Sequence, residues 1–325
     1  MEITELLHEA QLRDLTKEEA IQLLNIKNCS EEYHELLKTA DIMSRREFHN
    51  KAYIFSQIGL NASPCPMNCK FCSMAASNYV MENKFHKGMA DIEELKEIVR
   101  RLVEAGTHDL FLMTTADYPI DEFLAVGSEI KKILPPTVRL VANIGDFDIG
   151  AAQKLSAAGF SGVYHICRLG EGKDTDIKPE RRIQTLHAVK DAGLDLYYCV
   201  EPIGPEHTYE ELVEEMFRAK EFGVEAMAAM RRTPVPGTPL AEKGVITATE
   251  LTKIGAVTRL VSKPTRSMNI HEVTPMTLIA GVNQLYAESG ANPRDTEKDT
   301  ASHRGYSVER IIELFKDAEY EVAEN

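Results

Sequence analysis

The chain has 325 residues, of which 43 % are apolar and 27 % are charged, and its formal net charge is −14 at pH 7. These values are typical of a folded protein with one large domain or two ordinary ones, and the acidic balance argues against nucleic-acid binding, which needs a basic surface. No basic segment followed by an apolar one begins the chain, and no apolar run is long enough to span a bilayer, so we expect a cytoplasmic protein without a membrane partner.

Residues 1–47 carry two helix-start signals. Thr16 is followed three positions later by Glu19, which is the pattern of a capping box, and Ser30 precedes a second amphipathic segment. Apolar runs typical of strands occur only after these helices. We therefore expect an N-terminal helical extension over residues 1–47 and one α/β domain over residues 48–325.

Short apolar runs alternate with amphipathic segments along the rest of the chain. The runs cover residues 52–60, 109–114, 138–144, 162–167, 194–200, 224–230, 267–273 and, more weakly, 289–292. The amphipathic segments cover residues 90–105, 120–133, 148–158, 179–192, 208–222, 246–262, 274–288 and 307–321. This recurrence indicates a parallel β/α fold. We expect a (βα)8 barrel of the TIM type, with a partial (βα)6 barrel as the alternative because two units are weak.

Three cysteines follow the first run with the spacing C-x3-C-x2-C: Cys65, Cys69 and Cys72. Iron–sulfur clusters are held by cysteine thiolates, usually four of them, so three on one loop leave one iron open for chemistry. The alternative is a zinc site, which needs a fourth ligand such as His86. Six cysteines in a chain of this length do not indicate a secreted disulfide framework, and a reducing compartment fits them better.

This spacing, with the aromatic Phe71 before the last cysteine and an apolar run before the loop, resembles the motif of the radical S-adenosylmethionine superfamily. The resemblance implies a four-iron cluster on Cys65, Cys69 and Cys72, with S-adenosylmethionine as the ligand of the fourth iron. It also implies reductive cleavage of the sulfonium to a 5′-deoxyadenosyl radical, with reduced flavodoxin or ferredoxin as the electron donor.

In a barrel the active site lies at the carboxyl ends of the strands. The second run ends at Thr114 and Thr115, where many members of this superfamily carry a Gly-Gly-Glu-like stretch that binds the methionyl amine. The small residues here offer hydroxyls and carbonyls for the same purpose. Asn143 ends the third run and is a candidate pocket residue, although this stretch also fits an ordinary turn in which Asp146 or Asp148 caps the next helix.

A cation and a carboxylate follow the fourth run. Arg168 and Glu171 suit the recognition of a zwitterionic amino-acid moiety, and the alternative is that they pair with each other. Arg182, in the next amphipathic segment, resembles the arginine that binds the methionyl carboxylate in biotin synthase. The alternative for Arg182 is a surface position on an amphipathic helix.

Glu201 ends the fifth run. Alternation along a strand places it on the same face as Tyr197 and Cys199, so we expect it to face the pocket. Ile203 and Gly204 resemble the backbone segment that packs against adenine in this superfamily. Glu201 and Ile203 are therefore candidates for binding S-adenosylmethionine.

The sixth and seventh runs end in candidate substrate contacts. Arg231 or Arg232 could bind an acidic group, and a structural salt bridge is an equal alternative. Residues 237–240, Gly-Thr-Pro-Leu, resemble a stretch after the sixth strand in biotin synthase. His271 is a candidate substrate contact, with a packed core histidine as the alternative.

Residues 50–300 resemble the biotin-synthase-like group, which includes biotin synthase, hydrogenase maturases, methylornithine synthase and two-component lipoyl synthases. Biotin synthase holds a second, sacrificial cluster on strand cysteines, and the second and third runs here contain none, which argues against biotin synthase proper. The other thiols, Cys29, Cys167 and Cys199, leave open an auxiliary cluster or a sulfur donor.

We therefore expect a radical enzyme that abstracts hydrogen from a small substrate, in cofactor biosynthesis or in the maturation of a metallocofactor such as that of a hydrogenase. One alternative is a sulfur-inserting synthase of the lipoyl type with an auxiliary cluster. Another is an iron–sulfur electron-transfer protein without turnover. The size of the chain and its polar strand ends favour an enzyme.

Overall fold

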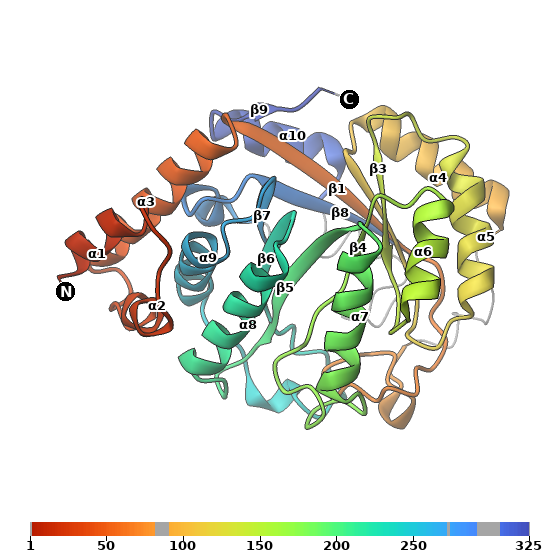
Figure 1. Ribbon diagram of the computed structural model, residues 1–325, viewed down its shortest axis with the longest axis horizontal. Coiled ribbons are helices and arrows are strands. Elements are labelled where there is room, and N and C mark those ends of the chain that lie inside the picture. Colours follow the sequence, from red (N-terminus) through yellow and green to blue (C-terminus); the bar gives the residue numbers. More distant parts are fainter. Residues whose placement is uncertain (1, 82–90, 272–273, 291–305, 325) are drawn as a thin grey trace.

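A computed structural model describes residues 2–81, 91–271, 274–290 and 306–324. Its centre is a closed barrel of parallel strands in the order β2-β3-β4-β5-β6-β7-β8-β1, and the pairing of β1 with β2 completes the ring (Figure 1). The strands are β1 (Lys51–Gly59), β2 (Asp109–Met113), β3 (Arg139–Asn143), β4 (Gly162–Tyr164), β5 (Asp195–Ile203), β6 (Ala226–Arg231), β7 (Ser267–Ile270) and β8 (Gln284–Gly290). The expected (βα)8 barrel is confirmed, and the (βα)6 alternative is wrong because both weak units supply a strand.

Helices cover the outside of the barrel, and their starts follow the sequence signals. Thr16 and Thr208 each form a full capping box with the glutamate three residues later. The α-helices are α1 (Ile3–Glu9), α2 (Lys17–Leu24), α3 (Glu31–Glu47), α4 (Ile92–Ala105), α5 (Ile120–Lys131), α6 (Ile149–Ala157), α7 (Pro179–Asp191), α8 (Tyr209–Phe222), α9 (Ala248–Ser262) and α10 (Val308–Asp317). Short 3-10 helices are η1 (Ala76–Asn78), η2 (Ala241–Lys243) and η3 (Pro275–Ile279).

The connection from β7 to β8 differs from the expected helix over residues 274–288. The 3-10 helix η3 is followed by Gly281 with a φ of +86°, and β8 then begins at Gln284. A Cβ on residue 281 would lie 2.7 Å from a backbone carbonyl oxygen of α3, so only glycine allows this turn. The strand expected at residues 289–292 therefore begins earlier, because the chain has already turned back into the barrel.

The helices α1–α3 lie beside α8 and α9 on one side of the barrel (Figure 1). The hydroxyl of Tyr33 on α3 donates a hydrogen bond to the carbonyl of Thr249 on α9 at 3.2 Å. Arg259 on α9 is fully buried and donates to Oγ of Ser44 at 2.7 Å and to the carboxylate of Glu47 at 2.6 Å. Buried polar contacts thus attach the helices that precede β1 to the barrel.

Charged side chains fill the barrel at the amino-terminal ends of its strands. Asp109, the first residue of β2, is fully buried, and its carboxylate accepts hydrogen bonds from Arg266 at 2.6 Å and from Gln284 at 2.8 Å. The hydroxyl of Tyr197 donates to the same carboxylate at 3.4 Å. Because this network occupies one end of the interior, the space inside the barrel lies toward the carboxyl ends of the strands.

A short strand, β9 (Glu321–Val322), pairs with the start of β1 outside the ring. His108 supports this pairing: Nδ1 accepts a hydrogen bond from the N–H of Ile54 at 3.0 Å, and Nε2 donates to the carbonyl of Ala323 at 2.8 Å. A strand of two residues shows no periodicity, so β9 could not be predicted from the sequence. None of the helices in the described residues is long and apolar enough to cross a membrane.

Candidate active site

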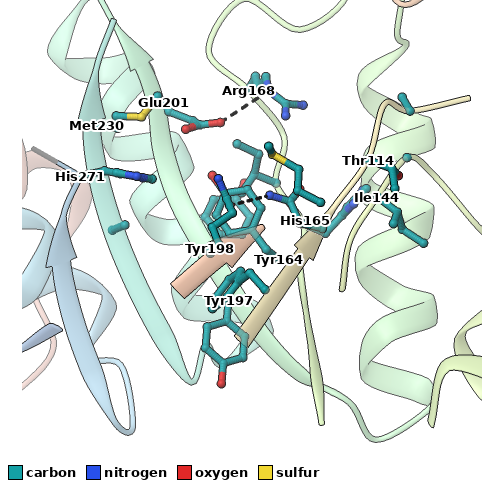
Figure 2. A pocket seen from close by; sticks show the side chains of 18 of the residues that line it. Thr114, Ile144, Tyr164, His165, Arg168, Tyr197, Tyr198, Glu201, Met230 and His271 are labelled. Atoms are coloured by element: carbon teal, nitrogen blue, oxygen red, sulfur yellow. Dashed lines mark hydrogen bonds and ion pairs between the residues drawn. The ribbon is translucent and has the colours of Figure 1, made fainter. Parts of the chain in front are cut away.

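An open cavity of about 1400 Å³, which includes space continuous with solvent, lies at the carboxyl ends of the strands, and side chains from all eight strands line it. Figure 2 shows side chains that line this cavity, among them Tyr164 and Tyr197. Polar groups gather at its mouth on the loop between β1 and η1, which we call the cysteine loop. A second polar region, the ionic wall, lies at the ends of β4 and β5 and consists of Arg168, Glu171, Arg182 and Glu201.

The cysteine loop is closed by its own backbone hydrogen bonds. The N–H of Cys65 donates to the carbonyl of Met74 at 2.7 Å, and the N–H of Ala76 donates to the carbonyl of Cys65 at 2.9 Å. Inside the loop, the N–H of Cys72 donates to the carbonyl of Cys69 at 3.0 Å. All three cysteines line the cavity, so the loop brings the predicted cluster ligands to one place.

The three thiols fit an iron–sulfur cluster better than a single ion. In the described part of the chain no three His, Cys, Asp or Glu side chains converge as ligands of one ion, whereas each thiolate of a cluster binds a different iron. Burial raises the pKa of Cys69 to about 11 and that of Cys72 to about 12, so a bound cation is needed to hold them as thiolates near neutral pH. His86, the alternative fourth ligand for zinc, lies outside the described residues.

The loop from β4 to α7, called the β4–α7 loop, is hydrogen-bonded to the cysteine loop. The backbone N–H of Lys70 donates to the carbonyl of Asp174 at 2.9 Å, and the N–H of Asp176 donates to the carbonyl of Met67 at 2.8 Å. Nδ2 of Asn68 donates to the carboxylate of Asp176 at 2.7 Å. The cysteine loop is therefore supported from the same strand end that carries the ionic wall.

Arg168 is the cation of the ionic wall that faces the cavity. Its Nε lies 3.6 Å from the Glu201 carboxylate, and its Nη1 lies 4.0 Å from the Glu171 carboxylate. Figure 2 shows Arg168 and Glu201 pointing toward one another at the edge of the cavity. Both distances are longer than a hydrogen bond, so the guanidinium keeps donors for a ligand. The Glu171 side chain is 1 % exposed and lies behind Arg168.

Arg182 is held more tightly than Arg168. It is 4 % exposed, and its Nε donates to Glu171 at 3.2 Å while its Nη1 donates to Asp146 at 3.1 Å. The surface position considered for Arg182 is wrong, because α7 turns this side chain inward to the cavity wall. Two of its donor nitrogens are already used within the protein.

Asp146 and His165 form a buried pair that the sequence analysis missed. Oδ1 of Asp146 lies 3.1 Å from Nε2 of His165, and His165 lines the cavity. Burial lowers the pKa of His165 to about 4, so the imidazole is neutral at neutral pH. Asp148 is the residue that caps α6, since its carboxylate accepts from the N–H of Ala151 at 2.9 Å. A capping pattern could not separate Asp146 from Asp148.

The ends of β2 and β3 form the opposite wall. Thr115 exchanges two hydrogen bonds with Asn61, one of 2.9 Å from its N–H and one of 2.8 Å to its Oγ1. Oγ1 of Thr114 is buried and has no hydrogen-bond partner among the described atoms, so it remains for a ligand. Nδ2 of Asn143 donates to Oε1 of Gln57 at 3.2 Å, and both side chains line the cavity.

Phe71 and Ile203 lie differently with respect to the cavity. Phe71 lines it, beside the last cysteine of the loop. Ile203 is 1 % exposed and is not among the lining residues, although its carbonyl accepts a hydrogen bond from the N–H of Arg232 at 2.7 Å. The contact predicted for Ile203 and Gly204 is one of their backbone with adenine, and it stays a prediction.

The candidate substrate contacts at the ends of β6 and β7 also differ in whether they line the cavity. Nη1 of Arg231 donates to the carbonyl of Ile246 at 2.7 Å, and Arg231 is outside the lining set. Arg232 is buried against Glu206, which is the salt bridge given as its alternative. His271 lines the cavity, and its Nε2 lies 3.5 Å from the buried carboxylate of Glu288.

A scan against protein-family models finds no match. Among curated relatives, biotin synthase of Acetivibrio thermocellus is 25 % identical over 257 residues, which cover 77 % of this chain and 78 % of the relative. Biotin synthase of Pelotomaculum thermopropionicum is 27 % identical over 290 residues, which cover 84 % and 87 % of the two chains.

Two solved structures share the fold over nearly the whole chain. HydG, a maturase of the [FeFe]-hydrogenase, has a TM-score of 0.81 at 18 % identity and covers 98 % of this chain and 75 % of its own. Methylornithine synthase (PylB) has a TM-score of 0.80 at 18 % identity and covers 98 % and 97 % of the two chains.

Three thiols line the cavity of a closed (βα)8 barrel, and a four-iron cluster and S-adenosylmethionine are the cofactors that these relatives imply. The curated relatives and the shared fold support a radical S-adenosylmethionine enzyme similar to the biotin-synthase-like group.

Proposed function

We propose that this enzyme abstracts hydrogen from a small substrate during the biosynthesis of a cofactor or the maturation of a metallocofactor. The observation that supports this most is that the three thiols and the pair Arg168 and Glu201 line one cavity inside the barrel. When bound, the cluster and S-adenosylmethionine supply a 5′-deoxyadenosyl radical by one-electron cleavage of the sulfonium. The names of the relatives, biotin synthase and a hydrogenase maturase, are consistent with cofactor chemistry.

The ionic wall suits the amino-acid moiety of S-adenosylmethionine. Arg168 offers guanidinium donors to a carboxylate, and Glu201 offers a carboxylate to an ammonium group. The backbone N–H of Arg168 donates to the Glu171 carboxylate at 3.1 Å, so the arginine is fixed by its main chain as well. Arg182 then acts behind it, by holding Glu171. Thr114, on the facing wall, supplies a hydroxyl without a protein partner in the described structure.

The wall formed by β1, β7 and β8 is left for the substrate. Asn269 is 2 % exposed and lines the cavity, and its Nδ2 donates to the carbonyl of Gln284 at 2.9 Å. This bond fixes the orientation of the amide, and Oδ1 is left as a buried acceptor without a partner among the described atoms. A substrate with an N–H or O–H group would satisfy it. His271 and Asn143 are the neighbouring candidate contacts.

Aromatic rings pack against one another inside the barrel. The rings of Phe55 and Phe111 lie 4.8 Å apart, and those of Phe111 and Tyr197 lie 5.2 Å apart in an edge-to-face contact.

The placement of the remaining thiols favours hydrogen abstraction over sulfur insertion. Cys167 and Cys199 are buried but are not among the residues that line the cavity, and Cys29 is exposed before α3. A sacrificial sulfur donor must reach the substrate. The cavity with its convergent polar groups likewise favours an enzyme over an electron carrier, because a carrier needs no room for a substrate.

Anaerobic incubation of the reconstituted, dithionite-reduced protein with S-adenosylmethionine tests the proposal. We expect 5′-deoxyadenosine, and Cys72→Ala should abolish both this product and the iron content. The absence of 5′-deoxyadenosine from a protein with about four irons per chain would contradict the proposal. About eight irons per chain would instead support sulfur insertion with an auxiliary cluster.

A further inference from the structure

The cavity extends deep into the barrel beside β6, where two small side chains face it. Ala226 and Ala228 both line the cavity, and Ala226 is the first residue of β6. Gln284, the first residue of β8, lines it as well. On this side of the barrel the open space therefore runs along the whole length of the strands, as far as the charged layer around Asp109.

Strand pairing places Asn269 in this deep part of the cavity. Asn269 on β7 is in register with Ala228 on β6 and with Gln284 on β8, and Tyr197 on β5 is in register with Ala226. We call the space that these five residues line the deep subsite. Figure 2 shows Tyr197 at the far end of the drawn side chains from the ionic wall, so the two polar regions hold different parts of a bound pair of ligands.

The side of the deep subsite that faces β6 is aromatic. Phe111 lines the cavity from β2, which lies opposite β6 in the ring of eight strands. Its ring lies 5.2 Å from that of Tyr197 and 4.8 Å from that of Phe55. The walls therefore suit an apolar chain rather than a strongly hydrated one.

The five residues that line the deep subsite carry no charged side chain. The nearby carboxylate of Asp109 accepts hydrogen bonds from Arg266 at 2.6 Å, from Gln284 at 2.8 Å and from Tyr197 at 3.4 Å. These bonds satisfy Asp109 within the protein and turn the Gln284 amide toward it. Because burial of an ion without a partner is strongly unfavourable, an uncharged group fits the deep subsite better than a carboxylate or an ammonium group.

Asn269 supplies the one directional group of the deep subsite. Its side chain is 2 % exposed, and its Nδ2 donates to the carbonyl of Gln284 at 2.9 Å. Oδ1 is then a buried acceptor with no hydrogen-bond partner among the described atoms. An acceptor of this kind favours a ligand with an N–H or O–H group over a ligand of the same shape that lacks one.

We propose that the deep subsite binds the far end of the substrate, and that this end is an uncharged hydrogen-bond donor, a primary amide or an alcohol, on an apolar chain. Asn269 determines the specificity by accepting the N–H or O–H. This inference rests on the proposed function, because it assigns the deep subsite to the substrate of that reaction. The carbon that loses hydrogen then lies between Asn269 and the cysteine loop.

Three probes of one shape test the deep subsite: butyramide, 2-pentanone and butyrate, which carry NH2, CH3 and O⁻ at the same position. Their binding to the reconstituted, oxidised holoenzyme with S-adenosylmethionine is measured by ligand-observed nuclear magnetic resonance. We expect butyramide to bind at least about tenfold more tightly than 2-pentanone, because only the amide satisfies Oδ1 of Asn269. Butyrate should bind more weakly than both, because its charge has no partner there.

Two variants locate the binding. Asn269→Leu keeps the size of the side chain but removes the acceptor, so the preference for butyramide over 2-pentanone should disappear. Ala228→Leu fills the deep subsite and should weaken both probes. Asn25→Leu is the matched control, because Asn25 is exposed at the end of α2 and its Nδ2 likewise donates to a backbone carbonyl, that of Ile21 at 2.8 Å.

The absence of butyramide binding, or equal binding of butyramide and 2-pentanone by the wild type, would overturn the proposal. So would a preference that survives Asn269→Leu, or butyrate binding that Ala228→Leu weakens. The assay for 5′-deoxyadenosine is independent of these probes. If butyramide binds as expected while no 5′-deoxyadenosine forms, the proposed function fails and the deep subsite stands as a binding site; if the nucleoside forms while the three probes bind alike, only the deep subsite fails.

Discussion

The loops after β2 and β3 touch where Gly145 faces Ala116: a Cβ on residue 145 would lie 2.0 Å from the carbonyl oxygen of Ala116. The end of a flexible side chain could move away from such a contact, but a backbone carbonyl cannot without displacing its loop. Thr114 and Asn143 lie directly before these two loops on the cavity wall. The close approach therefore fixes the distance between two polar groups of the site.

Gly145→Ala is expected to destabilise the protein by about 3 kcal/mol or more, because the methyl group must force the two loops apart. Gly150→Ala is the matched control, since its nearest neighbour would be the Asp148 side chain at 3.4 Å and the residue lies in the first turn of α6. We expect that control to change the stability by no more than about 1 kcal/mol. Thermal unfolding followed by circular dichroism measures both, and equal unfolding temperatures would contradict the steric argument.

Arg168→Gln is expected to weaken the binding of S-adenosylmethionine at least about tenfold, because a charged hydrogen-bond donor is lost at the cavity wall. Arg168→Lys should restore part of the affinity, since it keeps the charge but not the forked geometry. Equilibrium dialysis on iron-loaded protein measures the affinity. Arg310→Gln, on the surface of α10, is the control. A loss of iron in Arg168→Gln would show instead that the arginine supports the cysteine loop.

The stability of the protein should fall as the pH falls from 6.5 to about 4, because the pKa of His165 in the folded state is lowered from 6.5 to about 4 by burial. In this window the unfolded chain binds a proton that the folded chain does not, so protonation favours unfolding. The shift corresponds to about 3 kcal/mol at most. Unfolding temperatures measured across this pH range should fall less steeply in His165→Gln than in the wild type. Identical pH profiles would show that the imidazole does not titrate as its burial implies.

Removal of iron by a chelator should leave the barrel folded, since the cysteine loop closes through backbone hydrogen bonds such as that from Cys65 to Met74. The far-ultraviolet circular dichroism should stay unchanged, while the three thiols become available to a maleimide reagent. Cys29, which is exposed in any case, gives the background of the labelling experiment and can be removed by Cys29→Ser. A collapse of the circular dichroism signal on chelation would assign the metal a structural role.

The barrel could be predicted because each of its units carries local signals. Gly106 and Gly223 end helices in the left-handed conformation, just as glycine after an amphipathic segment predicts. The prediction of a helix after β7 was wrong because the apolar residues of this region also fit a helix. Only the contact of Gly281 with α3 decides against one. Such a contact joins segments far apart in the sequence and leaves no local pattern.

The candidate site could likewise be predicted where its signals are local in the sequence, and not where they depend on long-range contacts. The cysteine spacing is local and places all three thiols on the cavity, whereas the partners of Arg182 come from other strand ends. The sequence pattern around Asp146 was already explained by a helix cap, so nothing in it indicated the contact of Asp146 with His165. Arg231 and Ile203 had the right residue types, but neither lines the cavity, and the pairing of β5 with β6 is irregular between Val200 and Ile203.

The pairing of β1 with β8 has a consequence for biogenesis. The strand that leads into the cysteine loop is the first of the ring, yet one of its two neighbours is the last, which begins at Gln284. During translation β1 must therefore remain with one edge unpaired until β8 has left the ribosome. The ring can close only then. Iron is therefore best delivered to the completed chain, after synthesis, when the three thiols already face a common interior.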